Sequence, residues 1–284
     1  MSYSKYVFSG HESFPCKTLW LKKGYDFVVQ GRDFNSPEAV IDLGVGKNMV
    51  AAIRFWLRVF GICENDRPSW LGDYLFNDEK GKDKYLEDLA TLWLLHFHLV
   101  YRNEATLYNW FFTDFQRSRK PFTRENLNTY VKRRMIGEGK EKQFNANTVK
   151  RDIGVLMQNY CMPRVIQSHE DFSSLLLDLH LILFKEDTKE YVFNNEGKSN
   201  VIPEVFLYGL LTIKGDDNSI PFDMIQELGL IFCMTDLETI DMLRLLSERY
   251  PEALHYSDVA GIRQIQVMKK VEPSSILEYC YGTI

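Results

Sequence analysis

The sequence has few cysteines, and no two of them are spaced as a metal-binding or disulfide pair. Cys16, Cys63, Cys161, Cys233 and Cys280 lie far apart, without a Cys-x-x-Cys motif. This spacing excludes a zinc knuckle and indicates no disulfide framework, which fits a reducing compartment. Histidines and carboxylates at metal-ligand spacing are also lacking, so we expect neither a bound metal nor a cofactor.

Long apolar runs are lacking as well. The longest, LATLWLLHFHLVY at residues 89–101, is much shorter than the roughly 20 residues that a membrane-spanning helix needs. The opening MSYSKYVFSGHESF contains no apolar signal core. We therefore expect a cytoplasmic protein that contacts no membrane, and its 284 residues suggest more than one domain.

The sequence contains no complete phosphate-binding loop. Residues 43–48, LGVGKN, begin like one, but such a loop needs a longer spacing between its glycines and a Ser or Thr after its lysine. Here one residue separates Gly44 from Gly46, and Asn48 follows Lys47. We therefore expect no nucleotide site at Lys47.

Catalytic constellations are equally scarce. His11 and Glu12, in FSGHESFPC, could belong to an active site, and Cys16 is close by. No second histidine or carboxylate accompanies them at ligand spacing. A turn that carries Phe8 and Phe14 into the core is the simpler interpretation, so we expect no catalytic residues.

Charge is unevenly distributed along a chain whose net charge is −5. Residues 117–151 contain eleven Lys or Arg against three Glu, whereas residues 215–258 contain two Arg against ten Asp or Glu. One interpretation is a basic face for a polyanion and an acidic face for something else. The other is ordinary solvated surface.

Residues 36–62 have the pattern of a helix-turn-helix. Ser36 is a suitable N-cap, Pro37 suits the first helical position, and Gly44 suits the residue after the helix end. A second helix then begins at Lys47, after a short turn containing glycine. An ordinary helical hairpin in a helical core is the alternative.

The helix from Lys47 has two different faces at 100° per residue. The apolar stripe is Met49, Ile53, Trp56 and Phe60. The opposite face carries no acid and consists of Lys47, Ala51, Arg54 and Arg58. We expect Lys47, Arg54 and Arg58 to contact DNA, as the second helix of such a unit does. A strand and a Glu-Lys-Gly-Lys turn within residues 70–86 would supply a wing.

A second winged-helix unit is expected in the basic window. Thr123 and Asn145 are plausible N-caps of two helices, and two runs that flank a charged turn, LHLILFKED and KEYVFNN, predict a hairpin. The expected DNA-binding residues of this unit are Lys132, Arg133, Arg134, Asn147, Lys150 and Arg151.

The acidic C-terminal third contains fewer signals. We expect a helix after an N-cap at Thr235, a strand in GIRQIQVMK and a closing helix in SSILEYCYG. The resulting fold class is mainly α, with tandem helix-turn-helix or winged-helix units, short β-hairpins and a C-terminal helical domain. The expected domains are residues 1–85, 86–200 and 201–284.

Three blocks of the sequence resemble one known family. They are FSGHESFPCKTLWLKKGYD at 8–26, AVIDLGVGKNMVAAIRFWLRVFGI at 39–62 and DKYLEDLATLWLLHFHL at 83–99. They are similar to the signature blocks of the bacterial family catalogued as domain of unknown function 4007. The resemblance implies no catalytic residues. It implies a gene context beside sulfotransfer enzymes similar to phosphoadenosine phosphosulfate reductase, in islands for DNA phosphorothioation and defence against phages.

Together these observations favour a protein that binds double-stranded DNA, without doing chemistry itself, in a DNA-modification or phage-defence system. The first alternative is an adaptor whose charged faces dock protein partners, such as a sulfurtransferase or reductase of the same complex. The second is a nuclease or DNA-modifying enzyme that uses His11 and Glu12.

Overall fold

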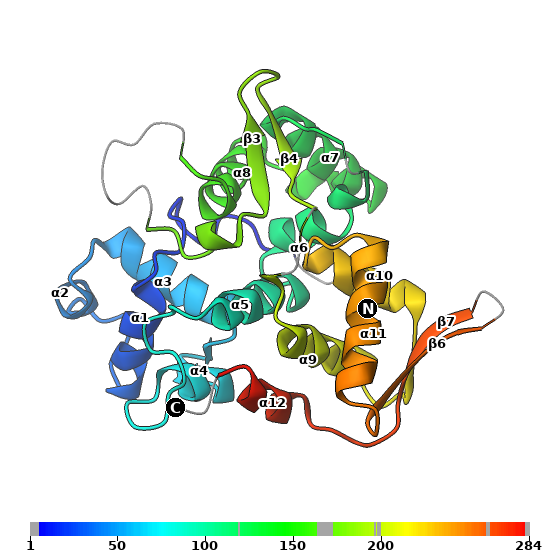
Figure 1. Cartoon of the computed structure of the whole chain (residues 1–284). Helices are drawn as coiled ribbons and strands as arrows, with labels where there is room; N and C mark the ends of the chain where they lie inside the picture. The colour runs from blue at the N-terminus through cyan, green and yellow to red at the C-terminus, as the bar shows by residue number, and fades with distance from the viewer. Residues whose placement is uncertain are drawn as a thin grey trace. The chain divides into compact units, whose positions relative to one another are not determined.

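The protein is mainly α-helical, as predicted (Figure 1). This computed structural model describes residues 6–118, 120–163, 173–195, 197, 200–259 and 262–281. The chain divides into two compact units, residues 1–194 and 195–284. The domain boundary expected near residue 85 lies inside the first unit. No helix in the described ranges is long and apolar enough to cross a membrane.

The first unit contains eight α-helices in the part of it that the structure describes. They are α1 (Trp20–Val29), α2 (Ala39–Leu43), α3 (Lys47–Val59), α4 (Trp70–Phe76), α5 (Leu89–Tyr101), α6 (Thr106–Thr113), α7 (Arg124–Gly137) and α8 (Ala146–Tyr160). Two antiparallel hairpins accompany them: β1 (Cys63–Glu64) with β2 (Arg67–Pro68), and β3 (Ile182–Lys185) with β4 (Glu190–Phe193). Helix α5 is buried from Ala90 to Val100, because it is apolar on all sides.

The stretch for which a helix-turn-helix was predicted contains two helices, α2 and α3, and it differs from the prediction in two details. Gly44 ends α2 at φ 58°, as expected, but α2 begins at Ala39, and the Ser36 hydroxyl accepts a bond from the Glu38 amide instead of capping the helix. The prediction of a strand within residues 70–86 is wrong, because residues 70–76 form the helix α4. Ser69 caps this helix by accepting from the Gly72 amide, and Leu71 and Leu75 are buried one turn apart.

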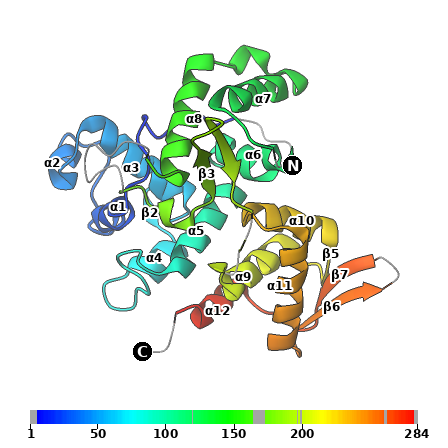
Figure 2. The same ribbon diagram turned by 45° about the horizontal axis from the view of Figure 1, so that its top comes forward.

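The second half of the first unit joins three helices to a hairpin. The order is α6, a short extended segment at Phe122, α7, α8 and then β3–β4. Phe122 and Tyr191 of β4 exchange both backbone hydrogen bonds, at 2.9 and 2.8 Å, so the segment before α7 pairs with the second hairpin strand. Figures 1 and 2 show the hairpin beside α8, which packs against α7.

The second unit has more β-structure than the sequence predicted. Its elements are α9 (Pro203–Lys214), β5 (Ser219–Pro221), α10 (Phe222–Ile231), α11 (Asp236–Arg249), β6 (Leu254–Val259), β7 (Ile262–Val267) and α12 (Pro273–Ile276). The three strands form an antiparallel sheet in the order β5–β7–β6. Thr235 caps α11 in a capping box with Glu238, which confirms the predicted N-cap. Strand β7 was predicted, but β5 and β6 were not.

Candidate nucleic-acid interface

Local sequence fixes where α7 and α8 begin. The Thr123 hydroxyl accepts from the Asn126 amide, and the Asn126 side chain accepts from the Thr123 amide, which makes a capping box. The Asn145 side chain accepts from the amides of Asn147 and Thr148. Both predicted N-caps are confirmed, and the amino end of α8 is thereby fixed with its first turn exposed.

Helix α8 has one buried and one exposed face. Val149, Ile153 and Leu156 are buried in the core of the first unit. The other side carries the exposed residues Asn147, Lys150, Arg151 and Gln158 with the half-buried Gly154 among them, and we name these five residues the α8 stripe. Lys150 and Arg151 have no hydrogen-bond or ion-pair partner among the residues that the structure describes. Their charges therefore point to solvent uncompensated.

Helix α7 adds four cations, of which Arg124 and Arg134 are engaged. Lys132 and Arg133 are exposed and, within the described chain, have no acidic partner. Arg134 differs from them, since it pairs with Asp114 and with Glu138, and its guanidinium lies 4.5 Å from the centre of the Trp110 ring. The structure therefore gives Arg134 partners within the fold that Lys132 and Arg133 lack.

Two of the three cations of α3, Arg54 and Arg58, are also engaged with carboxylates. Lys47 is exposed at the first position of the helix. Arg54 donates from Nε to Asp66 Oδ1 at 2.9 Å, and this hydrogen bond raises the pKa of Arg54. Arg58 Nε lies 3.4 Å from Glu104 Oε2. The basic face of α3 contains no acidic residue of its own, but Asp66 and Glu104 from two other segments pair with it.

His11 is buried in a structural position. Its ring stacks on Trp56 at 5.9 Å between centroids, and its Nε2 lies 3.3 Å from Asp152 Oδ1. The Ser13 amide donates to His11 Nδ1, so the ring proton is on Nε2, facing the carboxylate. Gly10 is required beside it, because a Cβ there would lie 2.3 Å from the Phe55 ring.

The thiol near His11 has the properties of a core residue. Cys16 is fully buried, and burial raises its pKa well above the ordinary value, so it stays protonated at neutral pH. Its amide donates to the Asn159 side chain at 3.0 Å. In the described part of the chain, no group of three or more His, Cys, Asp or Glu residues could hold a metal ion.

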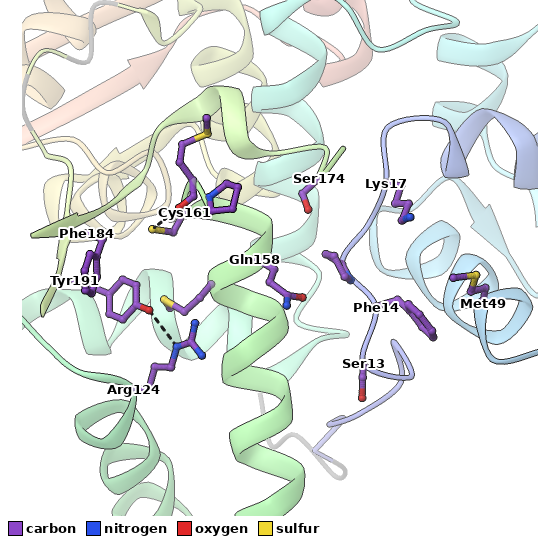
Figure 3. A pocket seen from close by; sticks show the side chains of 14 residues that line it. Ser13, Phe14, Lys17, Met49, Arg124, Gln158, Cys161, Ser174, Phe184 and Tyr191 are labelled. Carbon is purple, nitrogen blue, oxygen red and sulfur yellow. Dashed lines mark hydrogen bonds between the residues drawn. The ribbon is translucent and has the colours of Figure 1, made fainter. Parts of the chain in front are cut away.

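A pocket of about 430 Å³ lies at the carboxyl end of the α8 stripe (Figure 3). Figure 3 shows α8 with Gln158 in the middle, the segment with Ser13 and Phe14 on one side of it, and Tyr191 of the hairpin on the other. Arg124, which lines it, donates from Nε to the Tyr191 hydroxyl at 3.1 Å. No acid is among the described lining residues, so its charge has the same sign as the α8 stripe.

The structure brings only part of the predicted site together. Lys132, Arg133, Asn147, Lys150 and Arg151 are exposed on the packed pair α7–α8. Lys47, Arg54 and Arg58 belong to a different helix, α3. Gly154 and Gln158 were not predicted, although their spacing from Asn147 places them on the same helical face.

The fold and the surface define a mainly helical protein with a basic helix pair. The chain belongs to the family described as "Protein of unknown function (DUF4007)", which matches residues 8–281. The fold is similar to that of "Magnesium ion-bound SspB crystal structure", with a TM-score of 0.83 and 23% identity, and to that of "SspB crystal structure", with 0.80 and 23%. In both cases 98% of this chain and 88% of the other are covered. No curated protein matches the chain.

Proposed function

We propose that the protein binds double-stranded DNA through the α7–α8 pair, as a winged-helix unit. In this proposal α8 is the recognition helix, the β3–β4 hairpin is the wing, and Phe122 is the short strand that ties the wing to the helices. The observation that carries it is the α8 stripe, where Lys150 and Arg151 are exposed without acidic partners. Such side chains bind phosphate groups, and Asn147 is suited to a base edge.

The proposed context is a DNA-modification system of the phosphorothioation type, or a phage-defence system. Membership of the DUF4007 family supports this context through the gene neighbourhood that the sequence resemblance implies. The protein would deliver or orient partner enzymes on DNA without doing chemistry itself. The α2–α3 pair is proposed as a second, weaker contact, because Arg54 and Arg58 already have carboxylate partners.

The test is a salt series of duplex binding with Lys150→Ala/Arg151→Ala. Removing two phosphate contacts should weaken binding about equally for all sequences and reduce the slope of log K against log salt by roughly two. Lys269→Ala/Lys270→Ala removes two exposed cations of the second unit, which lie beside Glu252 and Glu272; it is the control for loss of charge and should leave the slope unchanged. An unchanged slope in the first variant would remove α8 from the interface.

A nuclease is the second candidate function, favoured by one observation. One of the two similar structures is described as magnesium ion-bound, and magnesium is a common metal of phosphodiester hydrolysis. The described residues form no cluster that fits a metal, and His11 is buried against Asp152, so we derive no catalytic step. Incubation of supercoiled plasmid with the protein and Mg²⁺ tests for nuclease activity. We expect no nicked product. Nicking that is abolished by Glu12→Gln would establish that the protein is a nuclease.

A further inference from the structure

The second unit repeats the element order of the α6–β4 region. A helix (α9) is followed by a short strand (β5), two helices (α10 and α11) and a hairpin (β6–β7). The short strand again pairs with the second hairpin strand, Ile220 with Ile265, as Phe122 pairs with Tyr191. Helix α11 therefore occupies in its unit the place that α8 occupies in the other.

The two helices can be compared residue by residue from their N-caps, Asn145 and Thr235. The buried positions correspond, since Ile153 matches Leu243 and Leu156 matches Leu246. The exposed positions correspond too, but their chemistry is inverted. Asn147, Arg151 and Gln158 of α8 match Leu237, Asp241 and Glu248 of α11, while Gly154 matches Arg244, which pairs with Asp241 at 3.3 Å. Lys150 matches Ile240, which is buried.

The surroundings of α11 strengthen the inversion. Between Gly215 and Tyr250, which includes all of α10 and α11, the sequence has eight Asp or Glu against two Arg, Arg244 and Arg249. On α10, which packs against α11, Asp223 and Glu227 are exposed. Leu237 is 66% exposed and Leu245 40% exposed on the same helix. Phosphate groups would be repelled from this face, while its exposed leucines favour a protein.

We infer that the α10–α11 face is a protein-docking surface, and that its occupant is the α7–α8 face of a second copy of this chain. The net charges of the two faces are complementary: Asp223 and Glu248 on one side, where Asp241 is paired with Arg244, and Lys132, Arg133, Lys150 and Arg151 on the other. Exposed apolar groups are present on both, since Ile136 of α7 is 44% exposed. Each copy carries both faces, so two copies contact reciprocally or several contact head to tail.

Such docking would cover the α8 stripe. Self-association and duplex binding then compete for Lys150 and Arg151, and DNA releases one copy from the other. The docking itself does not require DNA binding, whereas this competition rests on the proposed function.

The experiment is sedimentation velocity of the full chain at about 0.1 M and about 1 M salt, which shortens the Debye length from ~10 to ~3 Å. At low salt we expect a sedimentation coefficient that rises with protein concentration. At high salt we expect the sedimentation coefficient of a monomer. A monomer at every concentration in low salt would overturn the inference. Duplex binding is measured separately, so a chain that binds DNA but stays monomeric refutes the docking alone.

A charge exchange makes the test specific to the two faces. Asp241→Lys/Glu248→Lys makes both faces basic, and Lys150→Glu/Arg151→Glu makes both acidic. All four positions are exposed, so both variants should fold, which circular dichroism checks. Each variant alone should sediment as a monomer at low salt, and their equimolar mixture should associate. Association of either variant by itself, or a mixture that stays monomeric, contradicts the proposed pairing.

Discussion

Gly154 lies in the middle of the α8 stripe without a steric reason inside the chain. Nothing lies within 4 Å of the position that a Cβ would occupy there. Glycine inside a helix costs roughly 0.5–1 kcal/mol relative to alanine. A close approach of DNA to the helix backbone would explain why the smallest residue stands at this position.

Gly154→Ala should therefore separate stability from binding. We expect the free energy of unfolding to rise by about 0.5–1 kcal/mol, measured by urea denaturation. Duplex affinity should fall by roughly tenfold, which corresponds to ~1.4 kcal/mol. Gly137→Ala, at the end of α7 and equally open, is the control and should leave affinity unchanged. Unaltered binding by Gly154→Ala would place the DNA elsewhere.

His98 should make the fold sensitive to acid. Burial, together with nearby Arg102, lowers the pKa of His98 to about 3. The unfolded chain binds this proton near pH 6.5 and the folded chain does not, so the stabilisation is complete above pH 6.5 and is lost as the pH falls toward 3. At pH 5 the loss from this group is about 2 kcal/mol.

The measurement is the free energy of unfolding at pH 7 and pH 5. His98→Gln should lose about 2 kcal/mol less than the unmodified protein over this interval, because glutamine does not titrate. His255→Gln, on the exposed side of β6, should lose as much as the unmodified protein. Equal losses in all three proteins would show that His98 is protonated within the fold.

Arg54 and Arg58 of α3 are paired with carboxylates, whereas, among the described residues, Lys150 and Arg151 of α8 are not. This difference should be measurable as a difference in duplex affinity. Arg54→Ala/Arg58→Ala removes two charges that Asp66 and Glu104 already offset. We expect duplex affinity to fall less than in Lys150→Ala/Arg151→Ala at the same salt concentration. The melting temperature should fall slightly, since exposed ion pairs contribute about 0.2–1 kcal/mol each. Equal losses of affinity in the two variants would make α3 a full part of the interface.

Sequence alone located the elements that depend on local signals. The N-caps Thr123, Asn145 and Thr235 were predicted because a capping side chain bonds to amides two or three residues away. Strand β5 was missed because it exists through pairing with β7, more than 40 residues later. Such pairing has no local periodicity in a three-residue strand.

The candidate site, too, could be predicted only where the signal lies within a single helix. The exposure of Lys150 and Arg151 follows from helical periodicity within α8 itself. The engagement of Arg54 could not be predicted, because Asp66 reaches it from the β1–β2 turn, where Asn65 and Asp66 both have positive φ. The partners of Arg134 include Asp114, which lies twenty residues earlier. Periodicity shows which side chains leave a helix, but not which other segments meet them.

The two units can be observed separately in solution. All five tryptophans lie in the first unit, at Trp20, Trp56, Trp70, Trp93 and Trp110. Tryptophan fluorescence therefore reports the unfolding of residues 1–194, whereas circular dichroism reports both units.

Duplex DNA should stabilise the first unit selectively. At 100 times the dissociation constant a ligand adds ~2.7 kcal/mol, which for a unit of this size raises the fluorescence midpoint by roughly 5–10 °C. A second transition in circular dichroism should remain where it is without DNA. A single transition that both probes report, and that DNA shifts as a whole, would show that the chain unfolds as one cooperative body.

The segment around His11 is fastened to residues that leave the ribosome much later. The Ser9 amide donates to Asp152, and the Cys16 amide donates to Asn159, each across 143 residues. Thr18 likewise bonds to the backbone of Ser173. At roughly 5–20 residues per second, about 7–30 s of translation separate this segment from its partners. Until α8 emerges, the hydrogen bonds that hold Ser9 and Cys16 cannot form, so this segment is fixed against the core late in synthesis.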